Sequence, residues 1–216
     1  MSQKTGSETN GQTSRQGKPE LPDHPERILV ADDDHIIATG LSANLADLGY
    51  SVVGPARDGQ EAVELARQLI PDLALMDIRM PRLDGLQAAE VIYRELGIPV
   101  VIVSAFSDPE LVSTAQSIGV FGYLLKPVSA DQVRVNLSIA WGRFAEAVNS
   151  QSEVEQLRNR LEERKFIEQA KWIIVKRKGI AEDEAMRLLQ KQARNNRRPL
   201  VEVAQGVIEN ADLFGA

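Results

Sequence analysis

The sequence contains no cysteine and no long apolar segment. The lack of cysteine excludes disulfides, thiolate metal sites and cysteine nucleophiles. No apolar run approaches the roughly 18 residues that a membrane span needs. Residues 1–26 are polar and lack the apolar core of a secretion signal. We therefore expect a cytoplasmic protein that does not bind a membrane.

Acidic residues prevail in the chain as a whole, which carries a formal net charge of −6 over 216 residues. The two ends differ in sign. Residues 1–150 hold 20 acidic against 12 basic residues, whereas residues 151–216 hold 11 against 13. Within residues 165–198, ten basic residues stand against four acidic ones. This asymmetry is typical of an acidic module joined to a basic one that meets a polyanion, although a solvated helix face has the same composition.

Five short apolar runs alternate with helix-length segments after a polar start. Residues 1–25 hold almost no large apolar residue and are expected to be disordered. The near-continuous apolar character of the runs is typical of parallel strands covered on both faces. With right-handed crossovers, the pattern predicts an α/β fold, a doubly wound (βα)5 parallel sheet. The runs are residues 28–31, 52–54, 73–76, 100–103 and 123–125.

Only helical patterns follow the fifth run. Between Asp131 and Lys178 only Gly142 could interrupt a helix, which predicts one long helix or two nearly continuous ones, with coiled-coil character over 144–168. Gly179 is suited to end it, and the acidic run 182–184 suits the first turn of a further helix. A last helix is expected to begin near Pro199. The C-terminal part is thus a small three-helix all-α unit.

Polar side chains stand at the ends of four predicted strands. Because parallel strands end at the same edge of a sheet, these side chains are expected to meet there. Carboxylates about 4 Å apart repel by about 4 kcal/mol per pair at an effective dielectric of 20, so the cluster needs a cation or must take up protons. Oxygen ligands without His or Cys favour Mg²⁺, and a metal beside Lys and Ser is what phosphoryl transfer to a carboxylate requires. The residues concerned are Asp32, Asp33, Asp34, Asp77, Ser104 and Lys126.

Residues 27 to about 145 resemble a two-component receiver domain, which is flavodoxin-like. The resemblance rests on the stretches ILVADDD, LALMDIRMPRLDG, VIVSAFS and GYLLKPV, in this order. It implies that a sensor histidine kinase is a partner, that Asp77 accepts the phosphoryl group and that Pro127 follows a cis peptide bond. It also implies that Asp32, Asp33 and Asp77 hold Mg²⁺ with the backbone carbonyl of Arg79, that Ser104 and Lys126 contact the phosphoryl oxygens, and that Tyr123 is the switch aromatic.

Two positions of the receiver motif vary within the family. Arg79 lies two residues after Asp77, and Phe106 lies two residues after Ser104. A long cation and a bulky ring at these positions would hinder a water molecule that attacks the phosphoaspartate. We therefore expect slow self-dephosphorylation.

Residues 165–214 resemble the ANTAR domain, a three-helix RNA-binding module of transcription antitermination regulators. The resemblance rests on IEQAK, KRKGI, EDEAMRLLQKQA and NRRPLVEVA. Trp172 stands where the family usually has glycine, and we expect it to pack in the core rather than contact RNA. Arg194 stands where many members have methionine. The candidates for RNA binding are Lys171, Arg187, Lys191, Arg194, Asn195, Arg197 and Arg198.

The expected protein is a response regulator rather than an independent enzyme. Phosphorylation of Asp77 is expected to promote a homodimer that binds RNA stem-loops and stabilises an antiterminator. The alternatives are that the C-terminal helices bind DNA, which is the less favoured partner, or another protein. The expected parts are a disordered tail (1–25), the receiver (26–145), a coiled-coil linker (146–164) and the ANTAR domain (165–216).

Overall fold

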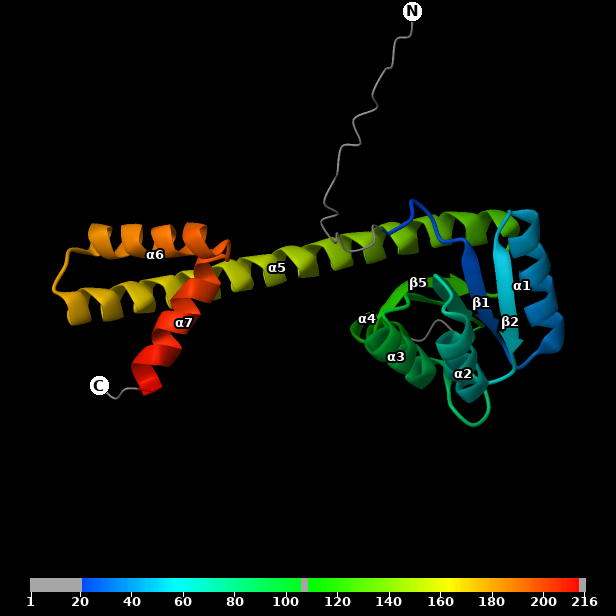
Figure 1. Ribbon diagram of the computed structural model, residues 1–216. Coiled ribbons are helices and arrows are strands. Elements are labelled where there is room, and N and C mark those ends of the chain that lie inside the picture. Colours follow the sequence, from blue (N-terminus) through cyan, green and yellow to red (C-terminus); the bar gives the residue numbers. More distant parts are fainter. Residues whose placement is uncertain (1–20, 106–108, 214–216) are drawn as a thin grey trace, which may run out of the picture. The chain divides into compact units, whose positions relative to one another are not determined.

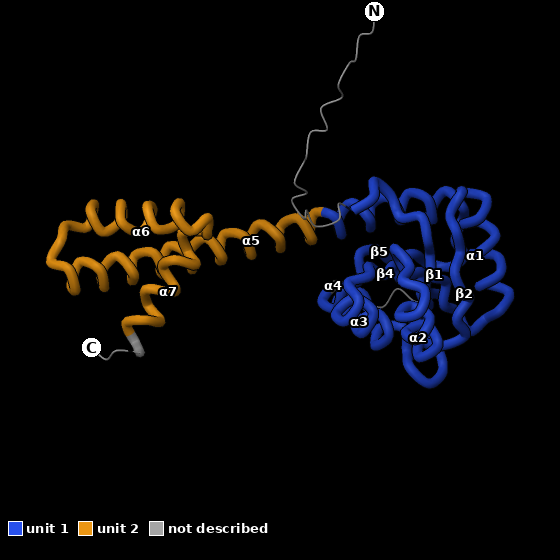
Figure 2. Tube along the Cα trace, viewed as in Figure 1, with its two compact units in different colours: residues 1–145 blue, residues 146–216 orange. Residues whose placement is uncertain are grey.

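The computed structural model describes residues 21–105 and 109–213 (Figure 1). Residues 1–20 of the expected tail and Phe106 lie outside this range. The chain divides into an N-terminal unit, Met1–Ala145, and a C-terminal unit, Glu146–Ala216 (Figure 2). At the end of the expected tail, Pro25 is buried and the Trp141 Nε1 group donates a hydrogen bond to the Pro22 carbonyl at 3.0 Å. These last tail residues therefore pack against the N-terminal unit.

The N-terminal unit is built on one parallel sheet. Its strand order is β2-β1-β3-β4-β5, so the order reverses between β1 and β3. This confirms the doubly wound sheet, and all five predicted apolar runs form strands. The strands are β1 (Arg27–Ala31), β2 (Ser51–Ala56), β3 (Leu73–Met76), β4 (Val100–Ser104) and β5 (Val120–Leu125).

A helix follows each of the first four strands, and an aspartate caps the start of three of these helices. The Asp34, Asp58 and Asp84 carboxylates each accept hydrogen bonds from backbone N–H groups in the first turn of the next helix, which satisfies donors that a helix leaves open. In the chain that the structure describes, these helices are α1 (His35–Asp47), α2 (Gly59–Leu69), α3 (Gly85–Leu96) and α4 (Pro109–Ser117).

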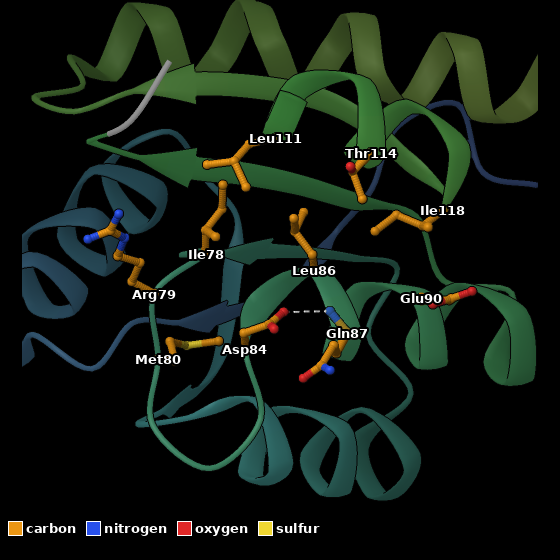
Figure 3. A pocket seen from close by; sticks show the side chains of 10 residues that line it. All are labelled: Ile78, Arg79, Met80, Asp84, Leu86, Gln87, Glu90, Leu111, Thr114 and Ile118. Carbon is orange, nitrogen blue, oxygen red and sulfur yellow. Dashed lines mark hydrogen bonds between the residues drawn. The ribbon is translucent and has the colours of Figure 1, made fainter. Parts of the chain in front are cut away.

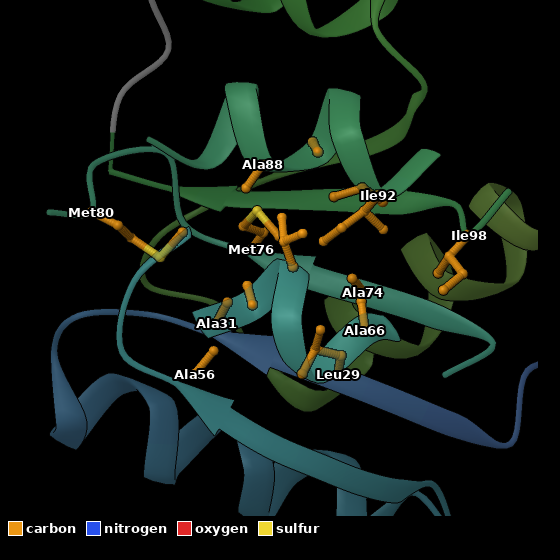
Figure 4. Packing of buried hydrophobic residues seen from close by; sticks show 14 of the residues in the cluster. Leu29, Ala31, Ala56, Ala66, Ala74, Met76, Met80, Ala88, Ile92 and Ile98 are labelled. Atoms are coloured by element: carbon orange, nitrogen blue, oxygen red, sulfur yellow. The ribbon is translucent and has the colours of Figure 1, made fainter. Parts of the chain in front are cut away.

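One face of the sheet packs on α2 and α3. Alternate strand residues such as Leu29 and Ala74 join Ala66 of α2 and Ile92 of α3 in a single buried cluster (Figure 4). Residues that point to the other face, such as Ile28, are equally buried. Burial on both faces explains why the strands are apolar without alternation.

The C-terminal unit contains three helices in the described residues. They are α5 (Ala130–Lys178), which begins in the N-terminal unit, α6 (Glu182–Asn196) and α7 (Leu200–Leu213). Gly142 does not interrupt α5, and Gly179 ends it with a φ of 66°. Ala170 of α5, Leu189 of α6 and Ala204 of α7 form the centre of the small core. No helix in the described part of the chain is long and apolar enough to cross a membrane.

One apolar residue of this unit, Trp172, does not lie where we expected. Trp172 was predicted to be core but is 61% exposed, because Ala170 and Ile174 occupy the side of α5 that packs against the core. In α6, Leu189 is buried, whereas its neighbour Leu188 is exposed. Neighbouring residues on a helix point about 100° apart, so one of the two is turned outward.

Gly85 is a position where a side chain cannot fit. A Cβ atom there would lie 1.8 Å from the Asp77 carbonyl oxygen, whereas a Cβ at Gly40, in the exposed middle of α1, meets nothing within 4 Å. We expect Gly85→Ala to lower the free energy of unfolding by about 1–3 kcal/mol. The matched Gly40→Ala should raise it by about 0.5–1 kcal/mol. Urea denaturation of both variants checks this, and equal effects of the two substitutions would contradict it.

Candidate functional site

Three carboxylates meet where the strand order reverses. Asp32 and Asp33 follow β1, and Asp77 follows the adjacent strand β3. One oxygen from each lies within 4.8 Å of the others. Asp32 and Asp77 are only 3% and 7% exposed, while Asp33 is exposed. The buried residues Ala31 and Met76 directly precede Asp32 and Asp77, so the core fixes the strand ends that carry these carboxylates.

Lys126 brings a positive charge from the end of β5 to this cluster. Its Nζ atom lies 2.6 Å from Asp32 Oδ2 and 3.0 Å from Asp77 Oδ1. The Lys126 backbone N–H donates to the Ser104 carbonyl at 2.9 Å, which ties the end of β5 to the end of β4. The peptide bond between Lys126 and Pro127 is cis, as the receiver resemblance implied.

Backbone N–H groups orient the two buried carboxylates. The Asp34 N–H donates to Asp32 Oδ1 at 3.0 Å, and the Arg79 N–H donates to Asp77 Oδ2 at 3.0 Å. The loop from β3 to α3 is itself tied back, because the Gly85 N–H donates to the Ile78 carbonyl at 2.8 Å. The carboxylates are thus held in fixed orientations by the protein itself.

Burial and charge pairing act in opposite directions on the pKa values in this site. Burial raises the pKa of the Asp32 carboxyl above its ordinary value, even though Lys126 and the Asp34 N–H favour the charged form. For Lys126, burial opposes the charged form, but hydrogen bonds to Asp32 and Asp77 outweigh it and raise the pKa. The site therefore holds Asp32 as a carboxylate at a cost in folding free energy.

The charge of the cluster is suited to a divalent cation. Asp32, Asp33 and Asp77 carry three formal negative charges, and the Lys126 ammonium offsets one of them. The donors are all oxygens, which is the ligand type that Mg²⁺ prefers. The residues present therefore fit a magnesium ion.

Ser104 and Tyr123 lie on β4 and β5, beside the strands that carry the acids. Ser104 is fully buried at the last position of β4. Tyr123 is half-buried and packs against the hydrophobic cluster on the α2 and α3 side of the sheet. The switch role assigned to Tyr123 stays a prediction. Arg79 is exposed, while its partner in the expected slow dephosphorylation, Phe106, lies outside the described residues.

A cavity of about 670 Å³ adjoins this site between α3 and α4 (Figure 3). Ile78 and Arg79, the two residues after Asp77, line one part of it, and Leu86 of α3 and Leu111 of α4 line another. Five apolar and five polar or charged residues line it, and the Asp84 carboxylate accepts a hydrogen bond from the Gln87 backbone N–H at 2.8 Å.

Sequence reasoning missed an ion pair that holds the loop after Asp77. Asp58 is buried at the start of α2 and pairs with the Arg82 guanidinium. Arg82 has a φ of 66°, a left-handed conformation that is costly for a residue other than glycine. The Gly59 N–H also donates to the Leu83 carbonyl at 3.2 Å. Asp58 and Arg82 lie 24 residues apart, and no local pattern in the sequence could have paired them.

The candidate RNA-binding residues fall into two groups. Lys171 is mostly covered, and its Nζ atom lies 2.8 Å from Glu168 and 3.4 Å from Glu182, so it joins α5 to the start of α6. The other six are exposed on α6 and on the turn before α7: Arg187, Lys191, Arg194, Asn195, Arg197 and Arg198.

Comparison with known families agrees with both units. The model of the response regulator receiver domain matches residues 28–138, and the model of the ANTAR domain matches residues 155–208. This chain is a response regulator of the ANTAR type. A similar protein is the transcriptional regulatory protein PdtaR of Mycobacterium tuberculosis, 40% identical over 185 residues, which cover 86% of this chain and 90% of PdtaR.

Other similar proteins match about half of this chain. The transcriptional regulatory protein LnrK of Bacillus subtilis is 41% identical over 110 residues, which are half of each chain. The signal receiver domain of the response regulator NarL from M. tuberculosis has a TM-score of 0.51 and 37% identity, covering 55% of this chain and 98% of that one. The response regulator therefore shares its receiver with a wider group of regulators.

Burial of Asp32 predicts a pH effect on the metal-free response regulator. A raised pKa means that the folded state favours protonated Asp32, so this contribution to stability is present below the unfolded pKa near 3.8 and is lost as pH rises through the folded value. Asp32→Asn mimics the protonated form. We expect the variant to gain stability relative to the wild type as pH rises from 4 to 7 with EDTA present.

Urea denaturation at each pH measures this difference. Asp47→Asn, which changes an exposed carboxylate at the end of α1, serves as the control and should follow the wild type. A difference between Asp32→Asn and the wild type that does not change with pH would contradict the stated cause.

Proposed function

We propose that this response regulator accepts a phosphoryl group on Asp77 from the phosphohistidine of a sensor kinase and thereby controls RNA binding by its ANTAR domain. The observation that supports the first part is the meeting of Asp77 with Asp32, Asp33 and Lys126 at one edge of the sheet. The reaction modifies the protein's own Asp77. The protein therefore acts as a regulator and not as an enzyme on other molecules.

Transfer of the phosphoryl group involves the carboxylate oxygens of Asp77 and the groups that contact them. A carboxylate oxygen of Asp77 attacks the phosphorus, a P–O bond forms, and the P–N bond to the kinase histidine breaks, which returns the histidine to its unmodified form. The Arg79 N–H already occupies Oδ2 at 3.0 Å, and Lys126 lies 3.0 Å from Oδ1. Lys126 is therefore placed to contact a phosphoryl oxygen, together with Ser104.

The acidic cluster beside Asp77 is the proposed binding site for Mg²⁺. Asp32, Asp33, Asp77 and the backbone carbonyl of Arg79 would hold it. When bound, the ion neutralises charge on the transferring phosphoryl oxygens. The protein itself supplies the orientation of Asp77 and the ammonium of Lys126.

Control of RNA binding begins with a change in charge at Asp77. Phosphorylation adds about 1.5 to 2 negative charges, which Ser104 and Tyr123 relay to the surface of β4 and β5. The helix α5 begins at Ala130, five residues after β5 ends at Leu125. We propose that this change promotes pairing of two copies, so that a dimer binds two RNA stem-loops and stabilises an antiterminator.

The exposed basic face of α6 supports RNA as the ligand. Arg187, Lys191 and Arg194 are spaced at i, i+4 and i+7, so they share one side of the helix. Arg197 and Arg198 extend this charge into the turn before α7. Cations draw in the RNA phosphates, while Asn195 and the arginines can bond to unpaired base edges.

The acceptor role of Asp77 is tested by incubation with acetyl phosphate and Mg²⁺. We expect the wild type to gain one phosphoryl group, seen by mass spectrometry of the intact chain, and Asp77→Asn to gain none because the amide is not a nucleophile. The control Asp72→Asn changes a carboxylate that binds the Glu26 and Arg27 N–H groups, away from the site. Phosphorylation of Asp77→Asn at the wild-type rate would exclude Asp77 as acceptor.

The RNA surface is tested with Arg194→Ala/Arg197→Ala. Loss of two phosphate contacts should weaken binding of an RNA stem-loop and make the plot of log K against log salt shallower by about 1 to 2 units. Filter binding at several salt concentrations measures both. The control Arg67→Ala/Arg94→Ala removes two exposed arginines of the receiver and should change neither.

Competition in the same assay decides the class of ligand. RNA binding that duplex DNA displaces at equal concentration would favour a DNA-binding regulator. Absence of any salt-dependent binding to either nucleic acid would favour a protein partner.

A further inference from the structure

Residues 21–26 lie just before β1 and run beside α5 (Figure 1). The Trp141 Nε1 group of α5 donates to the Pro22 carbonyl at 3.0 Å, and Trp141 is only 5% exposed. Pro25 is buried as well. Neither the phosphoryl site nor the candidate RNA surface uses this contact. We name residues 21–26 the strap.

The strap is anchored at its other end to the sheet. The Glu26 and Arg27 N–H groups both donate to Asp72 Oδ2 at 2.8 Å, and the Ser51 N–H donates to the Glu26 carbonyl at 2.8 Å. Asp72 directly precedes β3 and Ser51 begins β2, so the anchor lies at the amino ends of three strands. Asp77 follows the carboxyl end of β3. The strap therefore joins α5 to the sheet at the end remote from the acceptor.

The same turn of α5 also contacts β5. The Phe144 and Phe121 rings meet edge to face with their centroids 5.4 Å apart, and the Arg143 guanidinium donates to the Phe121 carbonyl at 3.3 Å. The centroids of the Trp141 and Phe144 rings lie 5.5 Å apart. Phe121 stands two residues before Tyr123 on β5. A shift of β5 around Tyr123 would therefore reach α5 through Phe121.

We propose that the strap holds the last receiver turn of α5, so that a shift of β5 is carried along the helix into its C-terminal part. Helix α5 runs without a break from Ala130 to Lys178, and Ala145 is the last residue of the N-terminal unit. A turn that is free to move by itself absorbs a displacement locally, whereas a turn fixed to the sheet passes it along the rigid helix. This inference rests on the proposed function, in which the state of the receiver controls RNA binding.

The strap packs loosely against the turn between α1 and β2. A cavity of about 260 Å³ separates part of the two segments, and its lining residues are His24, Pro25, Glu26, Leu48, Gly49 and Tyr50. Segments with few buried apolar contacts open at a lower cost in free energy than the core does. Substitutions in the strap should therefore release it while the sheet stays folded.

Two prolines favour the packed form of the strap. Pro22 and Pro25 restrict the backbone of the released segment, so less conformational entropy is lost when it packs. Glycine at both positions increases that loss and removes the buried Pro25 ring, while Trp141 itself is unchanged. Trp141→Phe is the complementary substitution, because it keeps an aromatic ring and removes the N–H donor.

Hydrogen exchange of the full-length chain measures how firmly the strap holds α5. We expect Pro22→Gly/Pro25→Gly and Trp141→Phe each to speed exchange of the amides in residues 137–145 about fivefold or more, which corresponds to about 1 kcal/mol for one hydrogen bond. Trp172→Phe removes the same indole N–H at an exposed position of α5 and should leave this exchange unchanged. Wild-type exchange in Pro22→Gly/Pro25→Gly would overturn the inference.

RNA affinity with and without beryllofluoride, a mimic of the phosphoryl group, measures the coupling. We expect the mimic to tighten binding of an RNA stem-loop to the wild type. In both strap variants the ratio of the two affinities should fall by about 2- to 30-fold, the range for residues that modulate coupling between sites, because the affinity with the mimic drops. Trp172→Phe should keep the wild-type ratio, since a direct effect on RNA binding changes both affinities alike.

The outcomes separate this inference from the proposed function. Strap variants that keep the wild-type ratio overturn the inference and leave the proposed function intact. Strap variants that bind RNA without the mimic as tightly as the wild type does with it also overturn the inference, since the strap would then restrain α5 instead of transmitting the state of the receiver. A wild type whose RNA affinity does not respond to the mimic overturns both.

Discussion

The receiver depends on holding two carboxylates, Asp32 and Asp77, side by side out of water. Adjacent parallel strands bring them together, and the buried residues before them leave little freedom to move apart. Their mutual repulsion and loss of hydration are offset by Lys126, which bonds to both. Because a single ammonium cannot neutralise the cluster, the site retains an attraction for a divalent cation. The arrangement that suits phosphoryl chemistry therefore lowers the stability of the folded protein.

The backbone around the acceptor is as constrained as the acids themselves. Gly85 lets α3 start against the carbonyl of Asp77, and the Arg79 N–H orients the acceptor carboxylate. The pair of Asp58 and Arg82 fastens the outer part of the same loop to α2. The loop is thereby held at both ends, so that the Arg79 carbonyl has a defined position for its proposed role.

Helix α5 carries both buried and exposed apolar residues in the C-terminal unit. One side, with Ala170 and Ile174, forms the core with α6 and α7, and exposed apolar residues such as Leu161 and Trp172 lie elsewhere on the helix. The prediction of a long helix came from apolar spacing and from the lack of interrupting residues, and α5 confirms it; the coiled-coil character stays a prediction. Spacing could not tell which side Trp172 joins, because it is apolar in either environment, and the prediction that it packs in the core was wrong.

The sequence by itself determined the order of elements, the acids, serine and lysine at the strand ends, and the split of charge between the two units. These are local properties, because neighbouring residues alone define the apolar runs and the residue that follows each strand. Only the tertiary structure decided which distant residues meet: Asp58 with Arg82, and Lys171 with Glu182. It also decided that Leu189 rather than Leu188 is buried. Contacts of this kind depend on how helices rotate and pack against one another, which no stretch of sequence specifies alone.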